Sequence, residues 1–425
     1  MLFIYSSIQL GGIETFILRI SRTRFLMGKK TKILLIANKK KNDKLLINEI
    51  KKYAEIYFIE DFYKYKFYKY LPTHLIFIKN IKFKEMTFLF EDISQVHVAN
   101  SICGLLYKKI SDKLNVKSPL TIGIYHSKEF TWEFKKLPYF ERINRILFEK
   151  LLSISGVIFF NDKLPKKYSK YYNIEFSKIN LFPLGVIENT LSLKRSEKNK
   201  KNNILKIVSV GRLVNFKTYN LYMIDIINSL KDKYNIEYYV YGDGPLHEEM
   251  FQKIKKYSLE NRIFLKGSLS YDKLLDTLQE FDLFIGSGTA IIDASSLGVP
   301  SIIAIENNYE PTTYGYVSNI LGFTYHEDGL YDKISIRKMI TDFYNYNVDE
   351  VYNLKIQHIK WAEKFLMDKC VVNFENSIKQ YDINQFLEFK ISYYEYLKYS
   401  ISFFLFELYS RLKGKKSSDI IYGEN

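Results

Sequence analysis

Residues 283–304 read LFIGSGTAIIDASSLGVPSIIA and decide the fold that the sequence predicts. Leu283–Ile285 and Ser301–Ala304 are short apolar runs, and a glycine-rich turn and a helix that begins near Thr289 separate them. Runs that are apolar throughout are typical of parallel strands covered on both faces. The stretch therefore predicts a strand–helix–strand unit, the repeating element of an α/β domain.

The same alternation of apolar runs and helix-like segments continues on both sides of this stretch. Between the runs, one helical stripe is formed by Leu221, Ile224, Ile227 and Leu230. In the second half the further predicted strands are Ile207–Val210, Tyr238–Tyr241 and Ile263–Leu265. In the first half they are Leu2–Ser6, Lys32–Ile36, Ile56–Ile59, Leu75–Ile78, Val96–Ala99, Thr121–Tyr125 and Gly156–Phe160.

The length of 425 residues suggests two or three domains. Residues 194–203, KRSEKNKKNN, are wholly polar and predict a solvated linker between the two halves. We therefore expect an α/β fold with two Rossmann-like doubly wound domains, at 1–190 and 204–380, facing a central cleft. Such a cleft is the usual place for a ligand.

Residues 384–416 differ from the rest, because they form one long aromatic segment with scattered charges and a basic end. They predict a C-terminal helical extension. One interpretation is an amphipathic helix that lies on an anionic membrane surface. The other is a helix that packs its aromatic face on the rest of the protein, and the sequence leaves both open.

Composition narrows the function classes. The net charge of +16 favours anionic partners, and 47% hydrophobic residues exclude a disordered chain. Cys103 and Cys370 cannot form a disulfide framework or a thiolate metal cage, so we expect a reducing compartment. Met1–Ile13 has no basic residue before its apolar run and does not resemble a signal peptide, and Tyr399–Phe406 is too short to span a bilayer.

Glycines follow several of the predicted strands, where backbone amides can approach a ligand closely. Gly11 and Gly12 come directly after the first strand and before a helix, whose positive N-terminus favours an anion. Gly211 ends another strand, and Arg212 and Lys217 follow it within one loop. An Arg supplies a planar fork of donors and a Lys supplies a point charge, so the pair is suited to one diphosphate.

Two further glycine segments complete the candidate site. Gly242, in Gly-Asp-Gly-Pro, predicts first a tight strand-to-helix turn and second a loop backbone close to the ligand. Gly288, with Thr289 and Ala290, predicts a helix start whose amides face an anion. Asp293 lies one turn into that helix, and its carboxylate is suited to a pair of ribose hydroxyls.

Taken together, these segments resemble a known family. Gly-Gly-Ile-Glu near the start, Gly-Arg-Leu-x-x-x-Lys, Gly-Asp-Gly-Pro-Leu and Gly-Thr-Ala-x-x-Asp-Ala…Gly-Val-Pro occur in the order seen in the retaining "group 1" glycosyltransferases, which have the GT-B fold. The resemblance covers about residues 1–380 and is most specific over 207–304. Pro183–Val186 also resembles the strand that joins the two domains in that family.

The resemblance implies roles for individual residues. Arg212 and Lys217 match the cationic pair that holds the donor diphosphate, and Gly288–Ala290 matches the helix-start backbone at the same group. Asp293 matches the acid that binds the ribose, and Gly12 matches the amino-terminal loop that faces the phosphates.

Two positions concern the transferred sugar. His126 lies where the family often has a histidine near that sugar, so the predicted catalytic residues are His126, Arg212 and Lys217. The family also has two acids eight residues apart, and the first would fall at Ile285. The usual carboxylate contact to a donor-sugar hydroxyl is therefore missing.

The resemblance implies transfer of a sugar from a nucleoside-diphosphate sugar to a glycan or lipid-linked glycan, with retention, in bacterial capsule or lipopolysaccharide synthesis. No cofactor beyond the donor substrate is expected. The sequence has no Asp-x-Asp and no His/Cys cluster with ligand spacing, so we expect metal-independent transfer. The expected location is cytoplasmic, with possible peripheral contact to the inner face of an anionic membrane.

Two other functions fit parts of the sequence. A nucleotide-sugar epimerase can share the two-domain architecture and would act on the donor without an acceptor. A basic nucleic-acid-binding protein would fit the charge of +16 and the many aromatic residues. Against the second, the Lys-rich runs are scattered and mixed with Glu, and we expect no nucleic-acid partner.

Overall fold

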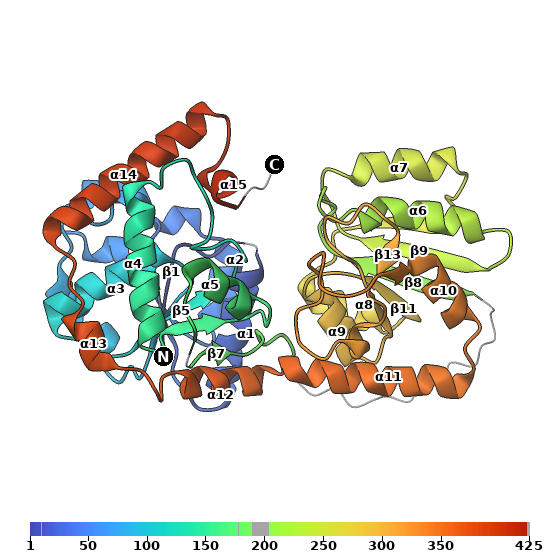
Figure 1. Ribbon diagram of the computed structural model, residues 1–425, viewed down its shortest axis with the longest axis horizontal. Helices are drawn as coiled ribbons and strands as arrows, with labels where there is room; N and C mark the ends of the chain where they lie inside the picture. The colour runs from blue at the N-terminus through green and yellow to red at the C-terminus, as the bar shows by residue number, and fades with distance from the viewer. Residues whose placement is uncertain (10, 177, 189–203, 423–425) are drawn as a thin grey trace. The chain divides into compact units, whose positions relative to one another are not determined.

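The computed structural model describes residues 1–9, 11–176, 178–188 and 204–422 (Figure 1). It divides into two compact units, each treated by itself below. Unit 1 is formed by Met1–Leu184 together with Met367–Asn425, and unit 2 is formed by Gly185–Leu366. The predicted linker at 194–203 lies outside the described residues.

A seven-stranded parallel sheet forms the centre of unit 1. Its order is β3-β2-β1-β4-β5-β6-β7, so the chain first winds one way from β1 and then returns to wind the other way from β4. The predicted α/β class with a doubly wound sheet is thereby confirmed for this unit. The strands are β1 (Leu2–Tyr5), β2 (Lys32–Leu35), β3 (Glu55–Phe58), β4 (Val96–Val98), β5 (Leu120–Ile124), β6 (Val157–Phe159) and β7 (Asn180–Leu181).

Helices cover both faces of this sheet, which explains why its strands are apolar throughout. Leu2 and Ile4 of β1 pack under α3, α4, α5, α13 and α14, whereas Phe3 packs under α1, α2 and α12. The helices are α1 (Gly12–Leu26), α2 (Lys44–Ile50), α3 (Ser101–Leu114), α4 (Tyr139–Ser153), α5 (Leu164–Tyr172), α12 (Met367–Ser377), α13 (Ile383–Glu388), α14 (Tyr393–Leu412) and α15 (Ser417–Tyr422).

The strand predicted at Leu75–Ile78 is wrong. A short 3-10 helix, η4 (Thr73–Leu75), and a turn occupy this place, and Ile76 and Phe77 are buried in the core. A short apolar run is compatible with any buried conformation, and Pro72 here starts a turn. The other 3-10 helices of unit 1 are η1 (Lys39–Lys41), η2 (Ile59–Phe62), η3 (Lys66–Tyr70) and η5 (Phe83–Phe90).

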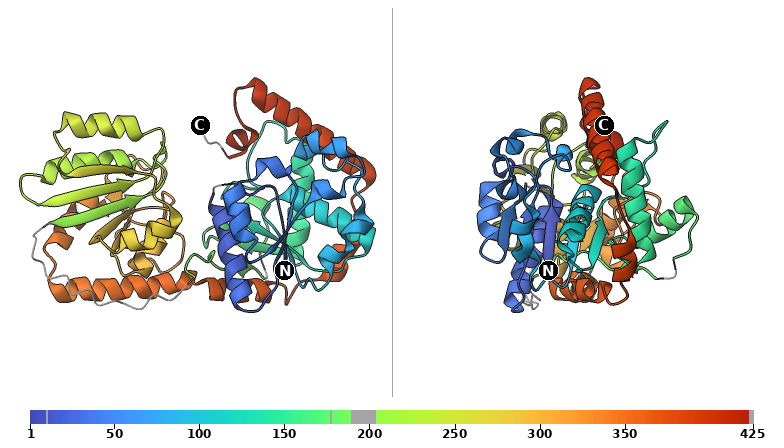
Figure 2. Two further views of the ribbon diagram at one scale, coloured as in Figure 1. Left: turned by 180° about the vertical axis from the view of Figure 1, so that it is seen from behind. Right: turned by 90° about the vertical axis from the view of Figure 1, so that its left-hand side faces the viewer.

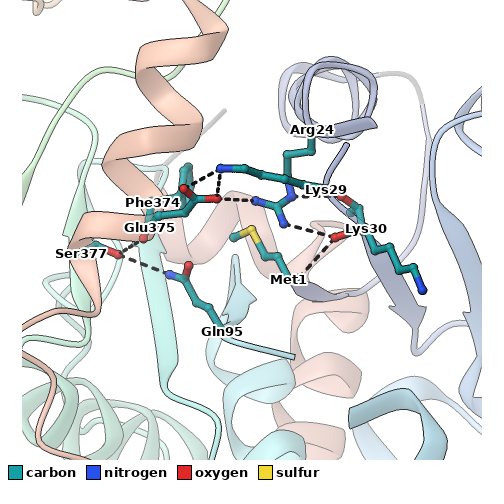
Figure 3. Close-up of polar contacts among 9 residues, drawn as sticks. Met1, Arg24, Lys29, Lys30, Gln95, Phe374, Glu375 and Ser377 are labelled. Carbon is teal, nitrogen blue, oxygen red and sulfur yellow. Dashed lines mark hydrogen bonds and ion pairs between the residues drawn. The ribbon is translucent and has the colours of Figure 1, made fainter. Parts of the chain in front are cut away.

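Helix α12 packs in unit 1, although the sequence analysis expected the second domain to extend over 204–380 and so to include this helix. Phe374 packs against Phe16 of α1, and Lys29 Nζ lies 2.6 Å from Glu375 Oε1 (Figure 3). Arg24 Nη1 lies 3.3 Å from the same carboxylate oxygen. These contacts stabilise α12 on unit 1, and the sequence of an amphipathic helix alone does not tell which sheet it covers.

The C-terminal extension is confirmed and packs within unit 1. Helix α14 runs beside α4, as Figures 1 and 2 show. Its Tyr396 lies 4.8 Å from the ring of Phe77, and its Phe403 stacks at 4.6 Å on Phe140. The aromatic residues of one face of this helix therefore belong to the core of the unit, as the second interpretation expected.

A five-stranded parallel sheet, in the order β10-β9-β8-β11-β12, forms the centre of unit 2. It is doubly wound as predicted, with β8 and β11 side by side where the winding reverses. A small antiparallel pair, β13 with β14, lies apart from this sheet. The strands are β8 (Leu205–Val210), β9 (Ile236–Tyr241), β10 (Ile263–Gly267), β11 (Leu283–Gly286), β12 (Ser301–Ile303), β13 (Thr312–Thr313) and β14 (Ile334–Ser335).

Two helical layers cover this sheet as well. Ile285 faces the core under α6, α7 and α10, while Phe284 faces the core under α8, α9 and α11. The predicted stripe lies on α6, where Ile224, Ile227 and Leu230 are buried and Leu221 packs beside them. The helices are α6 (Tyr219–Leu230), α7 (His247–Lys256), α8 (Tyr271–Leu278), α9 (Ala290–Ser296), α10 (Ile336–Tyr344), α11 (Val348–Ala362) and the 3-10 helices η6 (Val317–Asn319) and η7 (Glu363–Phe365).

The segment Pro183–Val186 passes from unit 1 to unit 2 without forming the predicted strand. The amides of Val186 and Ile187 both donate to the carbonyl oxygen of Phe365, at 2.8 and 3.0 Å. Because the two bonds share one acceptor at the end of unit 2, they do not continue into a ladder.

Candidate functional site

The carboxyl ends of the strands at which a doubly wound sheet reverses are the usual ligand site of such a fold. In unit 2 the reversal lies between β8 and β11, and the loop with Gly211 follows the first of these strands. The turn with Gly288 follows the second. In unit 1 the reversal lies between β1 and β4, and Gly11 and Gly12 follow β1. The segments at Gly11–Gly12, Gly211 and Gly288 thus lie at the reversal points of their own sheets, whereas Gly242 follows β9 and His126 follows β5.

Lys217 folds back over the glycine that begins its loop. A Cβ atom on Gly211 would lie 2.7 Å from Lys217 Nζ, so the absence of a side chain makes room for the ammonium group. The pKa of Lys217 is lowered from its ordinary value, chiefly by burial. The negative charge of Glu306 opposes this shift, and the positive charge of Arg212 adds to it. Arg212 itself is exposed. The loop therefore holds two cations close together, one of them already partly removed from water.

The Gly-Asp-Gly-Pro segment after β9 shapes this loop. A Cβ atom on Gly242 would overlap the carbonyl oxygen of Gly211, and one on Gly244 would overlap the carbonyl oxygen of Leu213. The amide of Leu213 donates to the carbonyl oxygen of Asp243 at 3.0 Å. Gly242 therefore allows two loops to lie in backbone contact, which supports the interpretation as a tight turn. Its predicted place near the ligand stays a prediction.

Replacing Gly242 by alanine should destabilise unit 2 by about 2–4 kcal/mol, because its φ of +155° is strained for alanine and the new methyl group overlaps backbone. Urea unfolding measures this change. Gly267→Ala is the matched control, since Gly267 has a φ of +69° but nothing within 4 Å of its Cβ position. Equal loss of stability in the two variants would contradict the close approach of the loops.

An acid that the sequence analysis missed lies beside the cations. Ser287, at the end of β11, donates its hydroxyl to Glu306 Oε1 at 2.7 Å. Ile285, where the family motif has its first acid, is a fully buried core residue. Glu306 comes shortly after β12, the strand beside β11. Because this strand was predicted, an acid just after it could have been recognised from the sequence as a candidate site residue.

Backbone bonds fix the position of Glu306 relative to the cationic loop. The amide of Asn307 donates to the carbonyl oxygen of Phe216 at 2.7 Å, and the Thr218 hydroxyl donates to the carbonyl oxygen of Asn308. The amide of Glu306 donates to the carbonyl oxygen of His326 at 2.9 Å. Two loops that are distant in the sequence are thereby joined, and Lys217 and Glu306 come to share one electrostatic environment.

Asp293 is enclosed by its surroundings, with 4% of the residue exposed. It lies in the first turn of α9 as predicted. Tyr325 connects this acid to the turn after β11, because its hydroxyl donates to the carbonyl oxygen of Gly288 at 2.8 Å. Burial, Glu306 and Asp293 all raise the pKa of Tyr325. Both acids of the site therefore act on one buried tyrosine.

In unit 1, Gly11 is the N-cap of α1 and Gly12 is its first residue. A Cβ atom on Gly12 would meet nothing within 4 Å, so this helix start has an open side. Glu14, in the first turn, accepts a hydrogen bond from the Tyr5 hydroxyl at 3.0 Å. Tyr5 ends β1, and the contact fixes the glycine turn on the strand.

His126 follows β5, and the last described helix of the chain covers it. Its ring lies 3.9 Å from the ring of Tyr422 of α15, and Lys128 Nζ donates to the carbonyl oxygen of Tyr422 at 2.7 Å. The amide of Lys128 donates to His126 Nδ1 at 3.1 Å. Burial, with Lys128 and Lys167, lowers the pKa of His126 to about 4. His126 is therefore neutral near pH 7, with its proton on Nε2.

Replacing Tyr422 by alanine should raise the pKa of His126 by about one unit or more, because water then reaches the ring. The lowered pKa makes the folded state less stable as pH falls from about 6.5 to about 4, so the variant should also lose less stability over that range. The NMR titration of His126 measures the shift. Tyr409→Ala, on α14, is the control, and an unchanged His126 titration in Tyr422→Ala would contradict the covering role.

Two general findings concern the described residues as a whole. Within them, no three His, Cys, Asp or Glu side chains come close enough together to hold a metal ion. Over the same residues, no helix combines the length and hydrophobicity needed to cross a bilayer.

Comparison with known proteins decides the family. Residues 192–311 match the model of the family described as glycosyl transferases group 1. This stretch is 120 of the 425 residues, so similarity to a group 1 glycosyltransferase domain is shown for that part of the chain. Arg212, Lys217, Gly242, Asp293 and the Gly288–Ala290 turn fall inside the matched range, whereas Gly11, Gly12 and His126 lie outside it. The resemblance to the group 1 glycosyltransferases is confirmed, whereas retention of configuration and the roles of single residues stay predictions.

Relatives and solved structures agree with this family. The chain is 34% identical over 126 residues to protein CapJ of Staphylococcus aureus, which covers 27% of this chain and 32% of CapJ. It is 24% identical over 370 residues to the GPI3 subunit of phosphatidylinositol N-acetylglucosaminyltransferase of Saccharomyces cerevisiae, covering 81% of this chain and 77% of that subunit. It is 24% identical to 2-deoxystreptamine N-acetyl-D-glucosaminyltransferase of Niallia circulans, over 50% and 58% of the two chains.

The chain also shares its fold with solved structures. The structure of HepE of Anabaena, in complex with UDP and glucose, has a TM-score of 0.54 and 14% identity, and the match covers 91% of this chain and 97% of HepE. The GT-B class expected from the sequence, with two parallel-sheet Rossmann-like domains, is thereby confirmed.

Proposed function

We propose that this chain transfers a sugar from a nucleoside-diphosphate sugar to a glycan or lipid-linked glycan. The observation that carries the proposal is the position of Lys217, over Gly211 at the carboxyl end of a reversing strand and within electrostatic range of both Arg212 and Glu306. Two cations suit the donor diphosphate, and an acid beside them suits hydroxyl groups of the donor.

In the proposed reaction, an acceptor hydroxyl forms a new bond to the anomeric carbon while the bond from that carbon to the diphosphate oxygen breaks. The nucleoside diphosphate leaves with the bonding electrons, and the proton of the acceptor hydroxyl passes to an oxygen of the leaving diphosphate. Lys217 and Arg212 stabilise the charge that grows on the diphosphate, which lets protein cations act without a metal ion. The amides at Gly288–Ala290 assist them, and Asp293 binds the ribose, as the family resemblance implies.

Glu306 takes the place of the acid that the family motif has at the position of Ile285. One of its oxygens accepts the Ser287 hydroxyl, and a carboxylate has further acceptor sites for a sugar hydroxyl. Its negative charge also opposes the lowering of the Lys217 pKa by burial. For unit 1, the roles of His126 near the transferred sugar and of the Gly11–Gly12 turn at the phosphates stay what the family resemblance implies.

The donor sugar we propose is N-acetylglucosamine, carried by uridine diphosphate. Support comes from the names of the GPI3 subunit and the Niallia circulans relative, both N-acetylglucosaminyltransferases, and from the UDP in the HepE structure. Retention of configuration follows from the family resemblance. We further propose a role in bacterial surface polysaccharide synthesis, in capsule or lipopolysaccharide, at the cytoplasmic side of the membrane.

A thermal-shift panel tests this function. We expect UDP-N-acetylglucosamine to raise the melting temperature more than UDP-glucose, UDP-galactose or GDP-mannose, because a ligand at 100 times its Kd stabilises by about 2.7 kcal/mol. Addition of a glycan acceptor should then release UDP. No shift with any nucleotide sugar would contradict the proposal, and conversion of the donor without an acceptor would show an epimerase instead.

A further inference from the structure

Helix α14 carries apolar side chains on two opposite faces. One face, with Tyr396, Tyr399 and Phe406, is buried in the core of unit 1. The other face is exposed and is formed by Tyr394, Ile401, Leu405, Leu408 and Leu412, which we call the outer stripe. The outer-stripe positions follow one another at seven, four, three and four residues, so they line one side of the helix. Leu405 is 58% exposed and Leu412 is 88% exposed.

Such a face is unusual for a helix that meets only water. The outward side of a surface helix is normally polar, and a row of exposed apolar side chains marks an interaction surface. Figure 2 shows α14 along the outside of unit 1. At 20 residues the helix is about 30 Å long, so its outer stripe extends over a distance comparable to a small domain.

Basic residues gather where the outer stripe ends. Arg411, Lys413, Lys415 and Lys416 are all exposed, and no acid lies between them in the sequence. The acids of the helix have partners within unit 1: Glu395 forms the capping box with Ser392, and Glu407 accepts the hydroxyl of Ser417 at the start of α15. The end of the helix therefore presents positive charge beside apolar side chains.

We propose that the outer stripe of α14 docks unit 1 on the surface of an anionic lipid bilayer. The helix would lie in the plane of the interface, with Leu405, Leu408 and Leu412 at the boundary of the acyl chains. The basic end would contact the phosphate groups of the lipids. Apolar area with adjacent positive charge matches a bilayer, which offers hydrocarbon and phosphate at neighbouring depths. The proposal does not depend on which sugar the enzyme transfers.

Sedimentation with vesicles tests the proposal on the full chain. The partition coefficient is measured on vesicles of phosphatidylcholine alone and on vesicles that also contain phosphatidylglycerol. We expect strong binding to the second kind. The variant Leu405→Ser/Leu408→Ser/Leu412→Ser should lower that partition coefficient at least about tenfold, while the protein stays folded because these side chains lie outside the core.

A matched control separates the outer stripe from general surface hydrophobicity. Leu45, Leu321 and Val348 are 82%, 96% and 75% exposed, and they lie on other elements. The variant Leu45→Ser/Leu321→Ser/Val348→Ser should bind the anionic vesicles as the natural protein does. A loss of binding as large as that of the outer-stripe variant would overturn the proposal.

The basic end is tested in the same assay. The variant Arg411→Gln/Lys413→Gln/Lys416→Gln should bind about a hundredfold more weakly, since each basic residue near an anionic surface contributes about fivefold. Equal binding to both kinds of vesicle would overturn the proposal. So would self-association in the absence of lipid that the outer-stripe variant removes, because the stripe would then join two copies of this chain.

Discussion

Replacing Lys217 by alanine should lower the rate of sugar transfer by about 10²- to 10³-fold, with the protein still folded. Lys217 is a cation partly removed from water, so its attraction for a diphosphate is stronger than that of a solvated lysine. A steady-state assay of released nucleotide measures the rate, and isothermal calorimetry with the nucleoside diphosphate measures the lost affinity.

Lys256→Ala is the control for Lys217→Ala, since Lys256 is an exposed lysine at the end of α7 in the same unit. We expect it to have the activity of the natural protein. Arg212→Ala should resemble Lys217→Ala, and the double variant should lose less than the product of the two effects because both cations act on one group. Full activity in the double variant would remove the proposed site.

Replacing Glu306 by glutamine should separate recognition of the sugar from recognition of the nucleotide. A hydrogen bond to a charged group contributes about 1.5–3 kcal/mol, so affinity for the sugar nucleotide should fall about 10- to 100-fold. Affinity for the free nucleoside diphosphate should stay the same or rise, because a negative charge beside Lys217 is gone. Calorimetry with both ligands measures the two affinities.

The same variant should change the pH dependence of transfer. Glu306 raises the pKa of Lys217, so its removal lowers that pKa further below the ordinary value. Lys217 then loses its proton at lower pH, and the alkaline limb of the pH–rate profile should move down. Glu310→Gln, at an exposed acid four residues on, is the control.

An equal loss of affinity for the sugar nucleotide and for the free nucleoside diphosphate in Glu306→Gln would contradict the assignment of Glu306 to the sugar.

The sequence predicts most of the sheets because buried parallel strands are apolar without interruption. The runs that became β11 and β12 are clear for this reason, and the stripe on α6 is clear from its helical period. The same rule failed at Leu75–Ile78, where an apolar run is buried as a turn. Periodicity records burial, and burial alone does not specify a strand.

Contacts between distant parts of the chain were not predictable in this way. Glu306 reaches the cationic loop through the bond between Asn307 and Phe216, and no local pattern specifies that pairing. Tyr422 covers His126 although almost three hundred residues separate them. The sequence of α12 indicates an amphipathic helix but not the unit on which it packs, and that is specified by contacts such as the ion pair between Glu375 and Lys29. The glycine turns were predictable as turns from their local sequence, whereas the backbone contact between the Gly211 and Gly242 loops was not.

A crystal structure with a bound nucleotide sugar tests the central claim most directly. We expect the diphosphate oxygens of the donor within about 3 Å of Lys217 Nζ and of the Arg212 guanidinium, at the carboxyl ends of β8 and β11. A sugar hydroxyl should contact Glu306. A diphosphate bound at another part of the molecule, or held there by other side chains, would contradict it.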